Sequence, residues 1–400
     1  MISNRFTRRR LLGALGAAGA LAVLPRCKSQ TGGSAGGGGR VKIGLVVPQA
    51  GVYAPLGTDM KRAWDLWLEL HGGKLGKLDV TTVVADEGES PQSGVPAVQK
   101  LLQNDQVDVL VGLVNSAVAL GAKDMVKEAK KLLIVTNAGA GAITGAARNP
   151  YIWRTSFTNA QISSVMGTHM AKLGSASPAY ILAPDYAAGS EVLAGFKKTF
   201  VDGGGQIAGE VKTPFGKTQD YQPFIAGIKS SGAKAAFCFF SGAEAVAFVK
   251  QYAQFGLAAE IPLYASGFLT EGSVLTAQAD AALGIQTTLH YSTELDNPAN
   301  KSFIEAYRGK YSATPTVFSV QTWDAASVLH RALATATALD GDSLSKALEG
   351  VGTIDDSPRG PWSFDGQSPK QRIYLRKVEK HGTDYVNTVV TDLGVFAQVS

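Results

Sequence analysis

Cysteine is scarce in this chain of 400 residues: it occurs only at Cys27 and Cys238, so no framework of disulfides holds the fold together. Metal-ligand patterns are missing too, because the five histidines stand far apart, with no cysteine or carboxylate at ligand spacing. No Gly-x-Ser-x-Gly elbow stands at the end of a predicted strand, and no complete Walker sequence occurs. We therefore predict no catalysis, no metal site and no cofactor.

Acidic residues are absent from the first 40 positions, which hold seven basic residues. The formal net charge of +5 therefore describes the whole chain but not its main part. Of the 38 lysines and arginines, 31 remain from Val41 onward against 33 acidic residues, a net charge of −2. This balance gives no electrostatic reason to bind a polyanion, and we expect no nucleic-acid partner.

The first 24 residues have the pattern of an export signal. Three consecutive arginines precede an apolar run over residues 11–24, which is shorter than the ~20 residues that a membrane-spanning helix needs. The segment Thr7–Leu12 resembles a twin-arginine signal, and an ordinary bacterial signal peptide is the alternative. Both predict export to the periplasm.

Two processing routes fit the end of this leader. The segment Ala20–Ala22 matches a small-x-small cleavage site, whereas Leu24–Cys27 resembles a degraded lipobox, with Arg26 in place of a small residue. The Gly/Ser tract Thr31–Gly39 then has the composition of a flexible tether. We predict that residues 1–40 are export signal and tether, and lipidation of Cys27 is the alternative to its removal.

From Val41 onward, the pattern alternates buried strands with helices. Val41–Val47 is an apolar run that ends at Pro48, as expected of a strand buried on both faces. Residues 57–71 repeat apolar side chains at helical spacing. This alternation predicts right-handed βαβ units on a parallel sheet. It restarts after Tyr151–Thr155, so we predict a second α/β unit with its own sheet.

Candidate binding residues stand where the predicted strands end. In open α/β sheets, ligands bind at these carboxyl ends, where loop N–H groups and helix N-termini attract anions. Ser and Asn at such positions also cap helices, which is the structural alternative for each. From both units they predict a two-sided cleft. The candidates are Tyr53, Asn115, Ser116, Asn137, Ala138, Gly139 and Ala140 in the first unit, and Tyr186, Phe240 and Ser241 in the second.

The glycine pattern of Gly139, Gly141 and Gly145 resembles one variant of a dinucleotide-binding turn. It follows the fourth predicted strand rather than the first, and no acid follows about 20 residues later. We therefore expect a close approach of the backbone to some small ligand rather than a cofactor.

Short segments at five places along the chain, in this order and spacing, match a known family. They are Val41–Leu45 with Gly51–Gly57, Val109–Gly112 with Asn115-Ser116, Tyr151–Thr155, Asp185-Tyr186 with Gly189, and Gly360-Pro361 with Phe364-Asp365. Over residues 41 to about 389, the chain resembles the type I periplasmic solute-binding proteins of ABC importers, in the leucine/isoleucine/valine-binding class, and within it the aromatic-acid-binding branch.

The resemblance implies an α/β fold of two doubly wound lobes, joined by three crossings and closing on a ligand in the cleft between them. Lobe one would comprise residues 41–158 plus 288–365, and lobe two residues 159–287 plus 366–400. It also implies a monomer that captures a small molecule and passes it to the membrane permease subunits of an importer.

The departures from the family pattern concern the ligand. Amino-acid binders hold the α-carboxylate with a Ser and a downstream Ala-x-Thr, and the α-ammonium with an acid of the second lobe. Ser116 matches the Ser, but the stretch Ala138–Ala140 lacks the Thr, and Phe268 stands near the position of the acid. A buried ammonium without a carboxylate is costly. Two aromatics usual in the second lobe are replaced by Ala188 and Ser241.

We therefore predict a bulkier carboxylate ligand without an ammonium group, an aromatic acid. Ser116, Ala138 and Ala140 would meet its carboxylate, largely through backbone N–H groups. Two alternatives stay open: a branched-chain amino acid or amide, with Glu244 or Glu271 reaching the ammonium, and an extracytoplasmic sensor of the same fold. The ring slot would be lined by Tyr53, Tyr186, Phe240 and Phe268.

Overall fold

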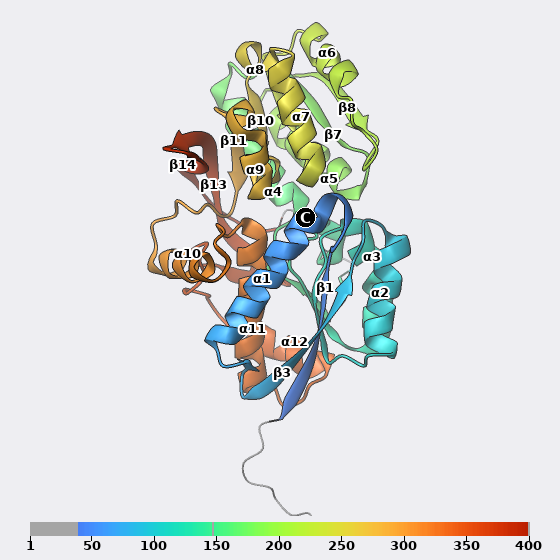
Figure 1. The fold of residues 1–400 in the computed structure, drawn as a ribbon. Coiled ribbons are helices and arrows are strands. Elements are labelled where there is room, and N and C mark those ends of the chain that lie inside the picture. The colour runs from blue at the N-terminus through green and yellow to red at the C-terminus, as the bar shows by residue number, and fades with distance from the viewer. Residues whose placement is uncertain (1–38, 146–147, 399–400) are drawn as a thin grey trace, which may run out of the picture. The chain divides into compact units, whose positions relative to one another are not determined.

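The computed structural model describes residues 39–145 and 148–398, and Gly38–Ser400 forms one compact unit. The export signal, the cleavage site and Cys27 lie outside the described residues, so these assignments remain predictions. None of the helices in the described part of the chain is both long and apolar enough to cross a membrane. Within the compact unit, the strands form two separate sheets, and Figure 1 shows each with its own helices as a lobe.

Lobe one is built on a six-stranded sheet. Its strands are β1 (Arg40–Val47), β2 (Lys74–Leu75), β3 (Leu78–Asp86), β4 (Val109–Gly112), β5 (Leu132–Val135) and β6 (Ile152–Arg154), in the order β2-β3-β1-β4-β5-β6. β2 pairs antiparallel with β3, and the other neighbours are parallel, so that Leu45 lies between Val84 and Val111. The carboxyl ends of the five parallel strands, β3, β1, β4, β5 and β6, therefore meet along one edge of the sheet.

The helices of lobe one come from two distant parts of the chain. They are α1 (Ala54–Leu70), α2 (Pro91–Gln103), α3 (Ser116–Ala129), α10 (Pro298–Tyr311), α11 (Val317–Thr335) and α12 (Gly341–Glu349). α1 begins three residues before its predicted start, because Pro55 fits the first turn of a helix. It buries Met60, Ala63, Trp64 and Trp67 at helical spacing, and α11 packs along it.

Lobe two contains the second sheet, in the order β12-β13-β11-β10-β9-β7-β8, with β14 paired to β13. Its strands are β7 (Ala179–Pro184), β8 (Ile207–Thr213), β9 (Ala235–Cys238), β10 (Leu263–Ser266), β11 (Gln286–Leu289), β12 (Ser363–Asp365), β13 (Ser368–His381) and β14 (Asp384–Phe396). Its helices are α4 (Asn159–Leu173), α5 (Ala187–Asp202), α6 (Gln222–Ser230), α7 (Gly242–Gln254), α8 (Leu257–Glu260) and α9 (Ser273–Gln278).

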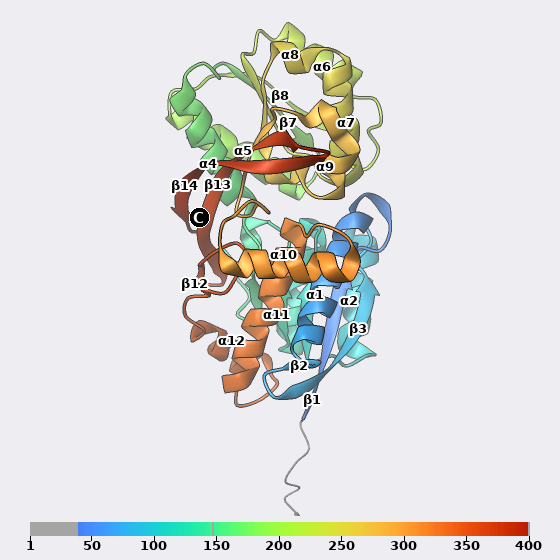
Figure 2. The ribbon, with the colours of Figure 1, turned by 60° about the vertical axis from the view of Figure 1, so that its left-hand side comes forward.

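The end of the chain returns to lobe two as a long hairpin. β13 pairs antiparallel with β11 and with β14, which runs beside it from His381–Asp384 to Gln371–Phe396. In Figure 2 the hairpin lies beside α9, and α10 crosses in front of α1. β11 ends at Leu289, so the sheet of lobe two extends two residues into the segment that was predicted for lobe one.

Three segments cross between the lobes, after β6, after β11 and between α12 and β12. Buried side chains bind them together. The guanidinium of Arg359 forms a buried ion pair with Asp324 at 2.7 Å and donates to the carbonyl oxygen of Thr155 at 2.7 Å. The Gln371 amide donates to the carbonyl oxygen of Ser156 at 2.9 Å. Such contacts fix the crossings on one side of the cleft, about which the lobes can close.

Candidate functional site

A narrow cavity lies between the lobes at the carboxyl ends of their strands. The volume open to water molecules is about 20 Å³, the space of roughly one water, so a ring enters only if the lobes part. Its lining is aromatic, aliphatic or polar and uncharged, and comes from both lobes: Tyr53, Val114, Ser116, Asn137, Gly139, Phe157, Asn159, Tyr186, Ala188, Phe239, Ser241 and Phe268.

In lobe one, the turn between β4 and α3 places Val114 and Ser116 at the cavity. Leu113, before this turn, has a φ of +70°, a conformation that a branched side chain rarely adopts. Asn115 does not line the cavity, because its side chain accepts a hydrogen bond from the N–H of Ala117 at 2.8 Å and caps α3. The hydroxyl oxygen of Ser116 accepts from the N–H of Ala140 at 3.1 Å, which leaves its own hydrogen free to donate.

The segment after β5 alternates between two environments. Asn137 and Gly139 line the cavity, whereas Ala138 and Ala140 are fully buried on the other side. The N–H groups of these two alanines already donate, to Leu113 and to Ser116. The predicted contacts of Ala138 and Ala140 with a ligand are therefore not available in this closed arrangement, and Asn137 and Gly139 face the cavity instead.

The buried guanidinium of Arg154 holds this segment from behind. It donates to the carbonyl oxygens of Ala138 at 3.2 Å and Ala140 at 2.7 Å, and to that of Phe157 at 2.6 Å. Burial lowers its pKa to about 9, against the opposing effect of the Glu191 carboxylate, so the group still carries its charge at neutral pH. A positive charge thus lies behind the wall that Asn137 and Gly139 form.

In lobe two, two helices begin at the cavity. The N-cap residues are Tyr186 for α5 and Ser241 for α7, and neither side chain caps its helix. Tyr186, Ala188 and Ser241 line the cavity. With α3, whose N-terminus Asn115 caps, three helix N-termini converge on the cavity, and their dipoles favour a negative charge there.

Aromatic rings form the rest of the lining. Phe268 packs against Phe157, with ring centroids 4.6 Å apart, and against Phe239 at 6.2 Å with an edge-to-face arrangement. The Phe240 ring, which was predicted to line the slot, is fully buried on the other face of the sheet against Tyr221 and Phe248. Phe239 takes its place, because successive residues of an extended segment face opposite sides.

Contacts across the cleft show that the lobes are closed. The hydroxyl groups of Tyr53 in lobe one and Tyr186 in lobe two are hydrogen-bonded at 3.1 Å. At the start of α7, a Cβ atom on Gly242 would lie 2.1 Å from the carbonyl oxygen of Val52. Only glycine permits this approach, and the φ of +57° at Gly242 also favours glycine.

Seven of the eleven predicted ligand-binding residues therefore lie together at the cavity, and whether they contact a ligand stays a prediction. Asn115, Ala138, Ala140 and Phe240 lie behind the lining. Sequence reasoning missed Phe157, Asn159 and Phe239. For Phe239 the signal was its position beside Phe240, whereas Phe157 lies in a crossing segment that no periodic pattern marks.

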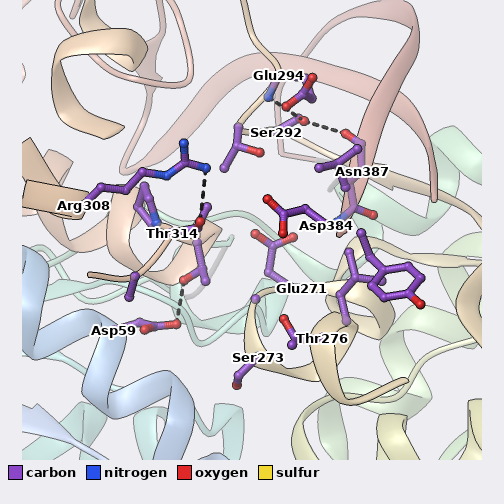
Figure 3. A pocket seen from close by; sticks show the side chains of 18 of the residues that line it. Asp59, Glu271, Ser273, Thr276, Ser292, Glu294, Arg308, Thr314, Asp384 and Asn387 are labelled. Carbon is purple, nitrogen blue, oxygen red and sulfur yellow. Dashed lines mark hydrogen bonds between the residues drawn. The ribbon is translucent and has the colours of Figure 1, made fainter. Parts of the chain in front are cut away.

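A second and larger cavity opens between the lobes beside α9, α10 and the β13–β14 hairpin. It offers about 430 Å³ to water molecules, and Figure 3 shows acidic and basic side chains around it. Many of these groups already have partners: Glu271 accepts from the N–H of Val317 at 2.8 Å and pairs with Arg376 at 3.0 Å. No group of three or more His, Cys, Asp and Glu side chains within residues 39–145 and 148–398 is placed to hold a metal ion.

Comparison with known proteins agrees with this geometry. The family model described as periplasmic binding protein matches residues 40–383. A Leu/Ile/Val-binding protein homolog of Brucella melitensis is 32% identical over 362 residues, 88% of this chain and 91% of that protein. An ABC-transporter solute-binding protein of R. palustris, solved in complex with benzoate, is 36% identical, with a TM-score of 0.82, and the match covers 90% of this chain and 98% of that one. A second, from Rhodopseudomonas palustris BisB5 in complex with 3,4-dihydroxybenzoic acid, is 34% identical, with a TM-score of 0.84 and the same coverage.

Proposed function

We propose a ligand for this chain from the following premise: it belongs to the periplasmic binding protein family, has the two-lobed type I fold, and is a non-enzymatic solute-binding component of an ABC transporter. The ligand is an aromatic carboxylate, which the lobes enclose as they close. The exported protein then passes it, as a monomer, to the permease subunits of the importer.

The observation that carries this proposal is the convergence of three helix N-termini on a cavity walled by aromatic rings. A carboxylate is stabilised at such N-termini, where Ser116 can donate from its hydroxyl group and Arg154 adds a positive charge from behind. Once the lobes part to admit it, a flat ring can lie against the side chains of Phe268 and Tyr186. The carboxylate of an aromatic acid therefore matches the helix N-termini, and its ring matches the aromatic side chains. The benzoates in the two related structures support the same ligand class.

A branched-chain amino acid is the second candidate, favoured by the names of relatives such as the Brucella melitensis protein. Its ammonium group would need a carboxylate partner. Glu271 is engaged by Arg376 and Val317 in the second cavity, and Glu244 accepts from the N–H of Gly216 at 2.8 Å behind the lining. Both acids would have to leave these partners to reach an ammonium.

Thermal unfolding with two ligand panels tests the proposal. One panel holds leucine, isoleucine, valine and their amides, and the other benzoate, hydroxybenzoates, phenylacetates and cinnamates. A ligand at a hundred times its Kd adds about 2.7 kcal/mol to the free energy of unfolding, several degrees in Tm. We expect shifts with the aromatic acids alone. Tight binding of leucine without any aromatic acid would refute the proposal.

A further inference from the structure

Two buried carboxyl groups flank the cavity, one behind each wall, without a cationic partner. Glu87 of lobe one is fully buried, and its two oxygens accept from the N–H groups of Val114 and Asn115, each at 2.8 Å. Glu244 of lobe two is 6% exposed and accepts from the N–H of Gly216. Glu87 thus holds the β4–α3 turn, which lines the cavity, and Glu244 holds Gly216, the residue after Phe215, whose ring stacks on that of Tyr186 with centroids 4.5 Å apart.

The groups that face these two carboxyls are acidic or phenolic. Glu87 faces Asp86 of its own strand end and Tyr53, while α2 and the β4–α3 turn present no charge to it. Glu244 faces Glu89 of lobe one, Tyr53 and, in its own lobe, Tyr186 and Tyr221. Arg154, whose guanidinium binds the carbonyl oxygens behind Asn137 and Gly139, does not act on the pKa of either carboxyl. Within residues 39–145 and 148–398, neither Glu87 nor Glu244 has a cationic partner.

An anionic ligand adds a further negative charge between them. Val114, which binds the Glu87 carboxyl through its N–H, itself lines the cavity, so ligand and carboxyl are separated by little more than one residue. Water that would screen their repulsion is excluded from the closed cleft. Protonation of the carboxyl group reduces this repulsion, because each bound proton removes one negative charge.

We propose that capture of the carboxylate ligand is coupled to the uptake of protons by Glu87 and Glu244, so that the closed cleft holds the anion together with neutral carboxyl groups. This inference rests on the proposed function and adds to it a second bound species, the proton. Affinity for the ligand then depends on pH although the ligand itself stays ionised.

The direction of the pH dependence follows from burial. Desolvation raises the pKa of Glu87 to about 8 and that of Glu244 to about 7 in the closed form, above their ordinary value of 4.5. When the lobes part, Glu244 loses the nearby Glu89 of lobe one, whose charge raises its pKa, so the pKa of Glu244 falls and closure binds a proton. The closed form is therefore favoured at low pH. Affinity falls as pH rises from 6 to 8, by about tenfold per pH unit for each proton coupled.

Titration calorimetry of the exported protein with 4-hydroxybenzoate measures the coupling directly. The apparent enthalpy at pH 7 is compared in buffers of different ionisation enthalpy, and Kd is measured from pH 6 to 8.5. We expect uptake of about 0.5 to 1.5 protons per ligand. Glu244→Gln should remove part of the uptake and keep its single bond to Gly216, since an amide oxygen accepts as well.

The double variant of Glu87→Gln and Glu244→Gln should abolish the uptake and flatten the pH profile of Kd. If Glu87→Gln fails to fold, the proton uptake of Glu244→Gln and the pH dependence of the wild-type Kd test the coupling instead. Glu128→Gln, at an exposed position on α3, is the matched control and should leave the uptake unchanged.

Three outcomes would overturn the inference, and they separate it from the proposed function. Binding of 4-hydroxybenzoate without proton uptake, or with uptake unchanged in the double variant, removes the coupling and leaves the ligand class intact. Binding of leucine with release of protons removes both, because ionised Glu87 or Glu244 would then serve an ammonium group. No binding of any aromatic acid also removes both.

Discussion

The two cavities between the lobes differ in how their polar groups are used. In the larger cavity, charged side chains satisfy one another or the backbone: Glu271 pairs with Arg376, and Asp59 accepts from the hydroxyl of Thr316 at 3.0 Å. In the smaller one, the lining is uncharged, and the N-termini of α5 and α7 lack side-chain caps. Size alone would favour the larger cavity as the ligand site, whereas unsatisfied polar groups support the smaller one.

From this difference we infer that the two sides of the interface between the lobes, one around each cavity, contribute differently to closure and to ligand binding. The flank around Glu271 joins lobe two to the N-terminus of α11 in lobe one, and this stabilises the closed arrangement without a ligand. The flank around Ser116, Phe239 and Phe268 leaves polar and aromatic surface that a ligand can complete. Matched substitutions in the two cavities can therefore separate ligand binding from closure.

The largest effect is expected from filling the smaller cavity. A Cβ atom on Gly139 would lie 2.3 Å from Oδ1 of Asn159 and 2.6 Å from Cε2 of Phe157. Gly139→Val would thus force the lobes apart and occupy the slot, and we expect Kd to rise by about a hundredfold or more. Titration calorimetry measures the loss. Thr276→Val, in the larger cavity, is the control and should leave Kd within twofold; equal losses in both variants would contradict the inferred difference between the two sides.

The next effect tests which of two adjacent rings faces the ligand. Phe239 lines the smaller cavity, whereas Phe240 packs with Tyr221 and Phe248 in the core of lobe two. Phe239→Ala should raise Kd by about tenfold through lost ring contact. Phe240→Ala should lower the free energy of unfolding by about 3–5 kcal/mol and leave Kd nearly unchanged. Calorimetry and denaturant unfolding together separate the two, and a loss of affinity at Phe240 alone would reverse the assignment.

The same pair of residues shows where sequence reasoning succeeds and fails. The alternation of apolar runs and amphipathic helices predicted the two α/β units and the strand ends at which the cavity lies, because burial on both faces dictates that pattern. It did not tell whether Phe239 or Phe240 faces the cavity. Which of the two side chains faces the cavity depends on how the alternation of faces continues after β9 ends at Cys238. Two adjacent phenylalanines contain no alternation from which this could be predicted.

Long-range contacts account for the other differences. Ala138 and Ala140 turn away from the cavity because Arg154, 14 residues beyond Ala140, binds their carbonyl oxygens. Phe157 reaches the cavity from a crossing whose path is set by contacts of Ser156 with Arg359 and Gln371, more than 200 residues later. No local pattern carries such information, whereas Ser116 and Tyr186 were predicted because they directly precede or begin helices.

Two glycines at the interface, Gly242 and Gly272, have a positive φ, +57° and +61°, so an alanine is strained at either position. At Gly242 the new Cβ meets the backbone carbonyl oxygen of Val52 at 2.1 Å, whereas at Gly272 it meets the side-chain Cγ2 atom of Thr316 at 2.5 Å. We expect Gly242→Ala to raise Kd by about fivefold and Gly272→Ala by less than twofold.

Calorimetry of both glycine variants, with their Tm values, checks this comparison. A larger loss of affinity at Gly242 than at Gly272 is the expected result. A larger loss of affinity at Gly272 would mean that the flank of the larger cavity limits closure.

The smallest effect concerns the one hydrogen bond that joins two tyrosines across the cleft. Tyr186→Phe removes the 3.1 Å bond between its hydroxyl group and that of Tyr53 but keeps the ring. A hydrogen bond of this kind contributes about 0.5–1.5 kcal/mol, so we expect Kd to rise by about threefold. Tyr385→Phe, at the larger cavity, loses a bond to Asp280 at 2.6 Å within lobe two and should leave Kd unchanged. Because the bond to Tyr53 exists only while the lobes are closed, its loss should speed ligand release rather than slow binding, which stopped-flow measurement of the two rate constants can decide.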